Sequence, residues 1–300
     1  MAGIQEAKDD PASLANRAFE RAIYPEGSPL RPETLDETAQ AVSGITREDV
    51  EGFYRRQYGP DRMILVITGD VKADRVKQAL QSRLGSWARN PQAQPIPTLQ
   101  VPLQEKPVRE VIPVPDKSET AILWGHAGGL KRSDPDFYAT QVLNMVLGGG
   151  GALNSRLGNT IRDEQGLAYT VFSFYESDLY PGPFEISLGT NPANAEKAVR
   201  SLQQVVERVR QQGVTQREVE EAIAYITGRF PQRLETNSGL AEVLWVAEFY
   251  NLGPDYIEKY PDYYRAVTVA QVNEAAKKHL HPDRATLVIA GTVPTPAAGQ

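Results

Sequence analysis

The sequence predicts an α+β fold in which a duplicated unit builds an antiparallel-rich sheet with helices on one face, and in which the first copy of that unit is incomplete. Three observations predict it: an internal repeat, a proline-rich stretch between two unequal parts, and strands followed by clustered helices in the longer part. The 300 residues exceed what one hydrophobic core usually organises. We therefore expect two domains.

The internal repeat relates residues 45–71 to residues 267–293. Ten of the 27 positions are identical, including the run Pro-Asp-Arg and the later run Leu-Val-Ile. Average residue frequencies would give about one or two identities by chance. Each copy is typical of a Thr N-cap, an amphipathic helix, a Pro-Asp turn and an apolar strand that ends at glycine. The repeat indicates a duplicated α/β unit.

The two copies are preceded by unequal lengths of chain. Residues 90–107 carry five prolines and little periodicity, which is typical of an extended linker. They separate residues 1–89, predicted to be the C-terminal part of a first domain, from residues 108–300, predicted to be a complete second domain. If both domains share one plan, about 100 residues of the first are missing. A naturally short protein is the alternative, but we favour a piece of a longer polypeptide.

The individual elements follow from periodicity and turn residues. The longer part predicts strands at 109–114, 120–127, 168–176 and 184–190, and helices at 134–147, 154–165, 193–211, 216–235 and 239–251, before the repeat element. The shorter part predicts helices at 12–23 and near 32–42. Strands joined by short connections and followed by helices favour a mainly antiparallel sheet.

Composition excludes several classes of function. A net charge of −6 gives no footprint for nucleic acid, and no apolar run is long enough to span a bilayer. The absence of cysteine excludes disulfides and thiolate chemistry, and three histidines argue against a zinc site built within the chain. Localisation stays open.

Residues 147–175 read LGGGGALNSRLGNTIRDEQGLAYTVFSFY and carry the main candidate site. A run of four glycines leads to a short helix with Arg162, and Tyr169 follows at the head of a β-rich run. An arginine and a phenol placed together can bind and polarise a peptide backbone. Each residue also has a plainer interpretation: Arg162 as a solvated arginine paired with Asp163 or Glu164, and Tyr169 as an ordinary strand aromatic.

This segment resembles the signature of the second domain of the M16 zinc metallopeptidases, which include mitochondrial processing peptidase and pitrilysin. The run FYRRQYGPDRMILVITGDV is similar to the segment that closes their first domain, so the resemblance covers nearly the whole chain. It implies the C-terminal part of a short-chain, bacterial-type member. It also implies two related domains around a cavity, the first holding zinc through a His-x-x-Glu-His helix and a downstream glutamate.

The resemblance places the second domain's catalytic Arg and Tyr at Arg162 and Tyr169. Tyr169 would donate to the scissile carbonyl oxygen as it becomes an oxyanion, and Arg162 would hold a neighbouring substrate carbonyl. Gly149, Gly150 and Asn191 are candidates for substrate binding. A tight connection at the glycines, and a turn role for Asn191 before Pro192, remain alternatives.

The chain departs from the family pattern because it contains no His-x-x-Glu-His. We therefore expect no zinc bound to this chain. The zinc would lie on an N-terminal domain or a partner subunit in a homo- or heterodimer. The resemblance therefore implies the substrate-binding half of a zinc-dependent metalloendopeptidase that is inactive alone. The alternative is a catalytically inactive M16-like scaffold, or a partner subunit of a heterodimeric protease or complex.

Overall fold

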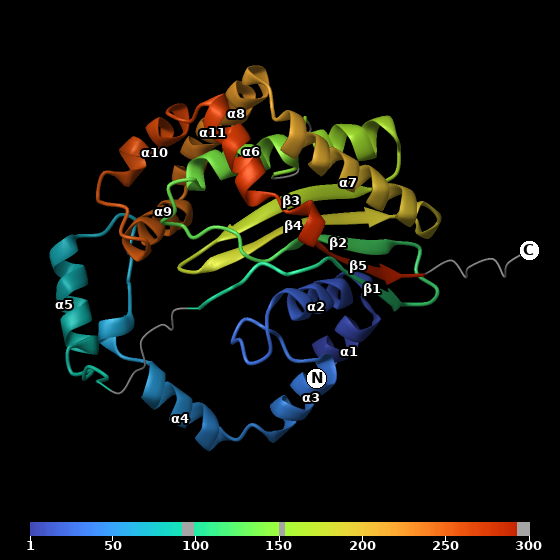
Figure 1. Ribbon diagram of the computed structural model, residues 1–300. Coiled ribbons are helices and arrows are strands. Elements are labelled where there is room, and N and C mark those ends of the chain that lie inside the picture. Colours follow the sequence, from blue (N-terminus) through green and yellow to red (C-terminus); the bar gives the residue numbers. More distant parts are fainter. Residues whose placement is uncertain (92–98, 150–153, 293–300) are drawn as a thin grey trace, which may run out of the picture. The chain divides into compact units, whose positions relative to one another are not determined.

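The computed structural model describes residues 1–91, 99–149 and 154–292 (Figure 1). Its contacts divide the chain into two compact units that interleave along the sequence. Unit 1 comprises Met1–Ala39, Leu99–Ala224 and Tyr263–Gln300, and unit 2 comprises Gln40–Thr98 and Tyr225–Asp262. Each unit therefore contains chain from both sides of the proline-rich stretch.

Unit 1 is built on a five-stranded sheet with the order β1-β5-β2-β4-β3 (Figure 1). The strands are β1 (Val108–Pro113), β2 (Thr120–His126), β3 (Thr170–Ser177), β4 (Pro181–Thr190) and β5 (Thr286–Gly291). The pair β1–β5 is parallel, and the pairs β5–β2, β2–β4 and β4–β3 are antiparallel. The predicted α+β fold with an antiparallel-rich sheet is confirmed.

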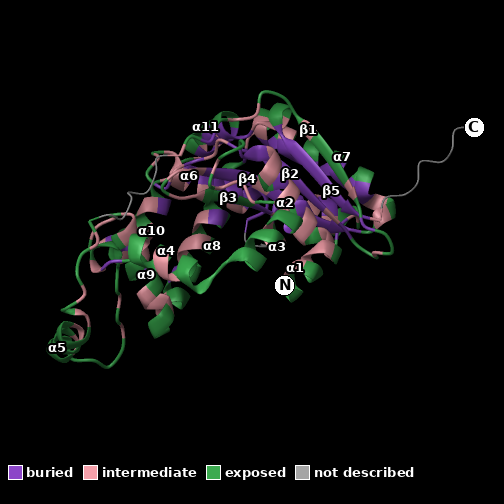
Figure 2. Cartoon of the chain, turned by 90° about the horizontal axis from the view of Figure 1, so that it is seen from below, coloured by how far each residue is buried: buried purple, intermediate pink, exposed green. Residues whose placement is uncertain are grey.

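The middle of this sheet is buried from both sides. All six residues of β5 are buried, and Leu287 lies opposite Arg109 of β1 and Trp124 of β2. A strand that is apolar at consecutive positions is stable only when both faces of the sheet are covered. Figure 2 shows the buried residues concentrated on β2, β4 and β5.

Helices cover one face of the sheet, as expected, and one further helix crosses the other face (Figure 1). The first group comprises α6 (Phe137–Leu147), α7 (Ala195–Gln212) and α11 (Val269–His279), with the short segments η2 (Gly158–Glu164), η3 (Pro192–Asn194) and η4 (Pro282–Arg284) in the connections. Helix α2 (Pro11–Ile23) packs on the opposite face, against β2 and β5. Helix α1 (Ala2–Asp9) precedes it.

Helix α2 buries a stripe of three residues against the sheet. Ala15, Phe19 and Ile23 recur every four positions, as one face of an α-helix requires, and all are buried. Asp10 caps the helix by accepting a hydrogen bond from the Ser13 N–H at 2.8 Å, and Pro11 occupies the first turn. The predicted helix is confirmed. Its place on the sheet of unit 1, together with strands from beyond residue 107, was not predicted.

Unit 2 is helical in the residues that the structure describes. It contains α4 (Arg47–Gln57), η1 (Pro60–Arg62), α5 (Ala73–Leu84) and α9 (Asn237–Phe249), while α3 (Leu35–Gly44), α8 (Gln216–Leu234) and α10 (Tyr256–Arg265) cross the unit boundaries. Thr46 and Asp49 form a capping box at α4, and Thr268 and Gln271 form the matching box at α11. The two helices of the repeat thus begin alike.

The strand expected at the end of the first repeat copy does not form. Residues 63–68 align with residues 285–290, which include five of the six residues of β5, but belong to no helix or strand. Leu65 and Ile67 are 50% and 44% exposed, whereas their equivalents Leu287 and Ile289 are 5% and 4% exposed. The prediction was wrong because a strand requires neighbours for its N–H and C=O groups, and the described part of unit 2 contains no strand.

Replacement of Phe19 tests the packing of α2 on the sheet. We expect Phe19→Ala to lower the free energy of unfolding by about 3–5 kcal/mol, because it opens a cavity between α2, β2 and β5. Chemical denaturation followed by circular dichroism measures this. The control is Phe53→Ala on α4, where the ring is exposed, and it should cost less than about 0.5 kcal/mol. Equal effects of the two substitutions would contradict the described packing.

Candidate functional site

The glycine run begins where α6 turns towards β3. Gly149 is buried, its N–H donates to the Asn144 carbonyl at 2.7 Å, and it forms a bridge with Ser173 of β3. A Cβ at Gly149 would lie 2.9 Å from the Asn144 carbonyl oxygen, closer than a real Cβ approaches. Gly149 therefore serves as a tight connection here. Gly150 lies outside the described residues, so its expected role stays a prediction.

Arg162 lies on η2, a π-helical segment whose apolar residues hold it to unit 1. Leu157 and Ile161 are fully buried, while the Arg162 side chain is partly exposed. Its Nε and Nη2 donate to the two carboxylate oxygens of Asp163 at 2.7 and 3.2 Å. This pairing raises the pKa of Arg162 and lowers the pKa of Asp163. The two bonds use two of the guanidinium's five N–H donors.

A short turn joins Arg162 to Tyr169. Gly166 adopts the left-handed conformation at φ 61°, and its N–H donates to the Arg162 carbonyl at 3.1 Å. The Leu167 N–H donates to the Ile161 carbonyl at 2.8 Å, and its own carbonyl accepts from Thr190 Oγ1 at 2.6 Å. The backbone of the turn is therefore tied both to η2 and to the end of β4.

Tyr169 is held by a backbone hydrogen bond, and its side chain is largely exposed. Its N–H donates to the Gly189 carbonyl of β4 at 2.8 Å, and the residue is 58% exposed. Within the described part of the chain, its hydroxyl makes no hydrogen bond. More than half of the surface of Tyr169 is therefore open to solvent, while its backbone is held at the end of β4.

Asn191 follows β4 and caps the next segment. Its side-chain oxygen accepts a hydrogen bond from the Ala193 N–H at 3.0 Å, at the start of η3. This is the turn role that the sequence offered as an alternative. The structure places Asn191 two residues after Gly189, the backbone partner of Tyr169.

One pair that fixes this region was missed from the sequence. Arg156, just before η2, donates through Nε and Nη2 to Glu218 at the start of α8, at 2.6 and 2.8 Å. Glu218 also accepts from the Thr215 N–H at 2.7 Å, and the Arg156 guanidinium holds the pKa of Glu218 down at about 2. The signal that could have found Glu218 is the Thr-x-x-Glu capping pattern at residues 215–218.

The histidines are used in ways that do not fit zinc ligation. His126 Nδ1 lies 2.8 Å from the Ala127 carbonyl, and Nε2 accepts the His281 N–H at 3.2 Å. His279 Nε2 lies 2.9 Å from Asp136, which also pairs with Lys278. Across residues 1–91, 99–149 and 154–292, no group of three His, Cys, Asp or Glu side chains is placed to hold a metal ion. The residues present do not fit the zinc of the M16 metallopeptidases.

Three carboxylates lie close enough for the charge of one to affect another: Glu20 of α2, Glu176 of β3 and Glu185 of β4. Burial, together with the charges of Glu176 and Glu20, raises the pKa of Glu185 to about 7. Burial and the charge of Glu176 also raise the pKa of Glu20. Like charges in a desolvated setting disfavour ionisation, so Glu185 is partly protonated near neutral pH.

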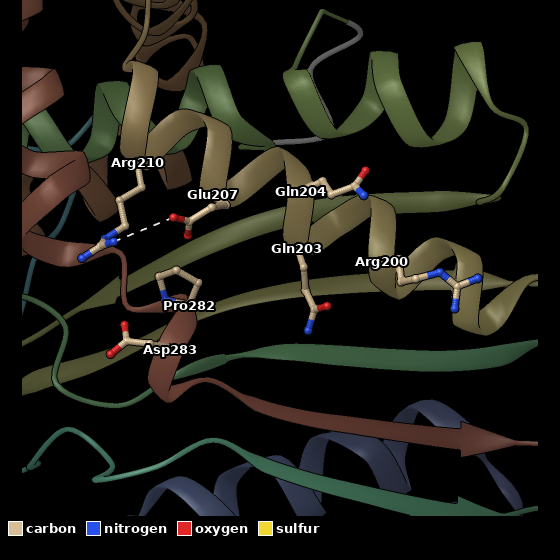
Figure 3. A pocket seen from close by; sticks show the side chains of 7 residues that line it. All are labelled: Arg200, Gln203, Gln204, Glu207, Arg210, Pro282 and Asp283. Carbon is tan, nitrogen blue, oxygen red and sulfur yellow. Dashed lines mark ion pairs between the residues drawn. The ribbon is translucent and has the colours of Figure 1, made fainter.

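The surface of α7 carries a cavity of about 690 Å³ beside η4 (Figure 3). Its seven lining residues mix both charges: Arg200, Gln203, Gln204, Glu207, Arg210, Pro282 and Asp283. Arg210 pairs with Glu207 across 4.0 Å at one end of the row (Figure 3). The lining contains neither Arg162 nor Tyr169, so this cavity is separate from the candidate site.

A family model described as the peptidase M16 inactive domain matches residues 44–226, more than half of the chain. The chain belongs to the M16 peptidase family. The resemblance seen in the sequence is confirmed, and the fold agrees with it.

Relatives of the M16 chain include proteins with and without an assigned peptidase name. An uncharacterized zinc protease of Streptomyces coelicolor is 26% identical over 239 residues, which are 79% of this chain and 51% of the relative. A Helicobacter pylori protein named a non-peptidase homolog is 22% identical over 292 residues, 96% of this chain and 65% of the relative. The chain spans about half the length of the Streptomyces relative.

A solved structure carries the same fold. The crystal structure of a peptidase M16 inactive domain from Pseudomonas fluorescens matches with a TM-score of 0.84 at 26% identity, over 98% of this chain and 69% of that one. The M16 chain is therefore an inactive-type domain related to proteins named zinc proteases. Among its described helices, none has the length and apolar character to cross a bilayer.

The buried His126 gives a testable dependence of stability on pH. Burial lowers the pKa of His126 to about 4 in the folded chain, against about 6.5 when unfolded. Between these two values the unfolded chain binds a proton at His126 and the folded chain does not. The free energy of unfolding should therefore fall by up to about 3 kcal/mol as the pH is lowered from about 6.5 to about 4. We expect the denaturation midpoint of His126→Gln to depend less on pH over this range than that of the wild type. The difference between variant and wild type isolates His126, because other titrating groups are common to both; parallel profiles would contradict the assignment.

Proposed function

We propose that this M16 chain is the substrate-binding half of a zinc-dependent endopeptidase, in which Arg162 and Tyr169 contact the peptide backbone. One observation carries the proposal: Tyr169 is fixed by its backbone to β4 while its ring stays in solvent, seven residues after a partly exposed arginine on the same turn. This combination leaves two strong hydrogen-bond donors available to a substrate.

The role proposed for Tyr169 is to donate its O–H to the scissile carbonyl oxygen. Hydrolysis places negative charge on that oxygen, and a hydrogen bond to a charged acceptor is about twice as strong as one between neutral groups. Because the bond strengthens as charge develops, it stabilises the transition state more than the bound peptide. The bond from Tyr169 N–H to Gly189 holds the residue in place for this task.

Arg162 is proposed to hold a neighbouring carbonyl of the peptide and so fix its register. The Asp163 carboxylate occupies Nε and Nη2 and orients the guanidinium, which leaves donors on Nη1 for substrate. Asn191 and the segment at Gly149 and Gly150 would lie along the same peptide as secondary contacts.

The zinc and its ligands are proposed to lie on another polypeptide segment. The described histidines are engaged elsewhere, and relatives named zinc proteases extend well beyond the matched region. A zinc-bearing N-terminal domain or partner subunit, in a homo- or heterodimer, would complete the site. Alone, this chain should not hydrolyse peptides.

A catalytically inactive scaffold or partner subunit is the second candidate. The Helicobacter pylori relative is named a non-peptidase homolog, and the Arg162–Asp163 pair is also what a surface arginine without function would form. A scaffold would not depend on the Tyr169 hydroxyl, and this separates the two candidates.

The Tyr169 hydroxyl is tested in the reconstituted pair. The candidate zinc-bearing half is a polypeptide with His-x-x-Glu-His, encoded upstream of Met1 or in an adjacent gene. The chain is mixed with this half, and the turnover of a quenched fluorescent peptide is measured. Tyr169→Phe should lower turnover on the order of 10²–10³-fold, because it removes the donor to the oxyanion.

Tyr180→Phe is the matched control, since Tyr180 lies at the opposite end of the β3–β4 pair. It should leave turnover within about two-fold of wild type. If Tyr169→Phe behaves like the control, the oxyanion role is wrong. If the wild-type pair has no activity, the scaffold candidate is favoured.

A further inference from the structure

Unit 1 contains a cavity of about 540 Å³ between α2 and the chain at residues 31–36, to which β1 contributes Glu110 and Ile112. In the sheet order, β1 lies at the edge opposite to β3, the strand that follows Tyr169. The cavity lining contains neither Arg162 nor Tyr169. The cavity therefore has no part in the peptidase role proposed above.

The α2 wall of the cavity is one face of the helix. Five residues of α2 line it: Leu14, Arg17, Ala18, Arg21 and Ala22. Their spacing of three and four positions places them on the same side of an α-helix. This side lies next to the stripe of α2 that packs on the sheet. Arginines and apolar residues therefore share a single wall.

The lining carries an excess of positive charge. Four lining side chains are cationic and two are anionic: Lys8, Arg17, Arg21 and Arg31 against Asp36 and Glu110. Lys8 Nζ pairs with Asp36 Oδ1 at 2.5 Å, which leaves three arginines and one carboxylate. The whole chain has a net charge of −6, so this excess of two positive charges is local. Like charges around one cavity repel each other, and an anion between them would relieve the repulsion.

Each of the three arginines is oriented by one backbone carbonyl. Arg17 and Arg21 donate through Nη1 to carbonyls of residues 32–33, and Arg31 Nη1 donates to the Tyr24 carbonyl at 2.8 Å. Within the described residues, none of the three makes another hydrogen bond. A guanidinium has five N–H donors in a fixed fork, so each arginine keeps donors for a ligand.

One further carboxylate approaches these arginines from outside the lining. Glu37 Oε2 lies 3.8 Å from Arg21 Nη1. The same oxygen accepts hydrogen bonds from the Thr34 N–H and Oγ1 at 2.7 and 2.8 Å. Glu37 therefore serves the start of α3, and it does not fill the cavity.

The remaining lining is mainly apolar. Leu14, Ala18 and Ile112 are partly buried and pack against the core of unit 1, and Leu35 is buried at the start of α3. An apolar surface with a few fixed polar groups is typical of small-molecule pockets, and the volume lies within their usual range of about 300–1,000 Å³. A fitting ligand combines an anionic group with an apolar body.

We propose that this cavity binds a small phosphate monoester with an apolar body. Such a group carries about −1.5 to −2 charges near pH 7 and three terminal oxygens, which matches three arginine forks and an excess of two positive charges. A carboxylate has one charge and two oxygens, and would leave one guanidinium without a partner. The apolar body would lie along Leu14, Ala18 and Ile112. This binding is independent of the proposed peptidase role.

Calorimetric titration of the full chain tests the site with three probes: phenyl phosphate, inorganic phosphate and benzoate. Phenyl phosphate carries both parts of the ligand, inorganic phosphate lacks the apolar body, and benzoate lacks the phosphate. We expect phenyl phosphate to bind 1:1 with a Kd below about 1 mM, and at least about ten-fold more tightly than either other probe.

Arg17→Gln should weaken phenyl phosphate binding at least about ten-fold, because charge-assisted hydrogen bonds are lost. Arg200→Gln is the matched control, since Arg200 is exposed on α7 and lines a different cavity. It should stay within about two-fold of wild type, because a distant surface charge is screened. Circular dichroism and the denaturation midpoint are recorded for both variants, because Arg17 also ties α2 to the Glu33 carbonyl.

Glu110→Gln separates ligand binding from folding. Glu110 is exposed on β1 and forms no ion pair within the described residues. Its replacement should strengthen phenyl phosphate binding about two- to five-fold, because a negative charge leaves the cavity. A loss of structure could not produce this gain.

Four results would overturn the proposal: no saturable binding of phenyl phosphate up to about 10 mM, equal affinity for inorganic phosphate, tighter binding of benzoate, or equal effects of Arg17→Gln and Arg200→Gln. Unchanged or weaker binding by Glu110→Gln would contradict the placement of the anion in this cavity. Peptide turnover plays no part in these measurements, so failure of the peptidase proposal leaves their outcome unaffected.

Discussion

Pairing of β5 on both of its edges is the constraint on which unit 1 depends. Because β1 and β2 take up its backbone groups, the Leu-Val-Ile run can be buried under α2 on one face and under the α6, α7 and α11 layer on the other. The same three residues at 65–67 show what happens without neighbours: the helix before them forms, but the strand does not. The run forms a strand in one repeat copy and not in the other because of backbone pairing, and not because of side-chain composition.

Much of this could be predicted from local sequence. The capping patterns at Thr46 and Thr268, the prolines at 60 and 282, and the apolar runs placed most elements within a few residues. What could not be predicted is non-local. Nothing in the residues of α2 says that its Phe19 stripe packs on a sheet more than 100 positions away, and nothing at 63–68 says whether strands are present to pair with it.

The candidate site shows the same division. The sequence placed Arg162 on a short helix and Tyr169 at the head of a β-rich run, and the structure joins the two through a turn in which Gly166 adopts positive φ. The Asp163 pairing was foreseen only as an alternative, and the Arg156–Glu218 pair was missed because it joins segments about 60 residues apart. The buried position of Gly149 depends on how closely α6 approaches β3, which sequence spacing does not report.

The role proposed for Tyr169 requires a residue that acts on a bound peptide without rearranging, and the backbone bonds around Tyr169 favour this. The Gly189 contact and the Thr190–Leu167 bond hold the turn before any substrate arrives, so little ordering cost remains at the reacting step. Membership of the M16 family, and coverage of only about half of the Streptomyces relative, support the proposal that another polypeptide completes the site.

In the role proposed here, the Tyr169 hydroxyl binds the transition state more tightly than the peptide. The most direct measurement compares wild type and Tyr169→Phe, each paired with the zinc-bearing half, for affinity towards a phosphinic peptide with a tetrahedral centre and towards the matching uncleaved peptide. We expect Tyr169→Phe to lower the affinity for the tetrahedral peptide by about the same factor as kcat/KM, and to leave the affinity for the uncleaved peptide unchanged. An equal loss for both peptides, or no loss for either, would contradict it.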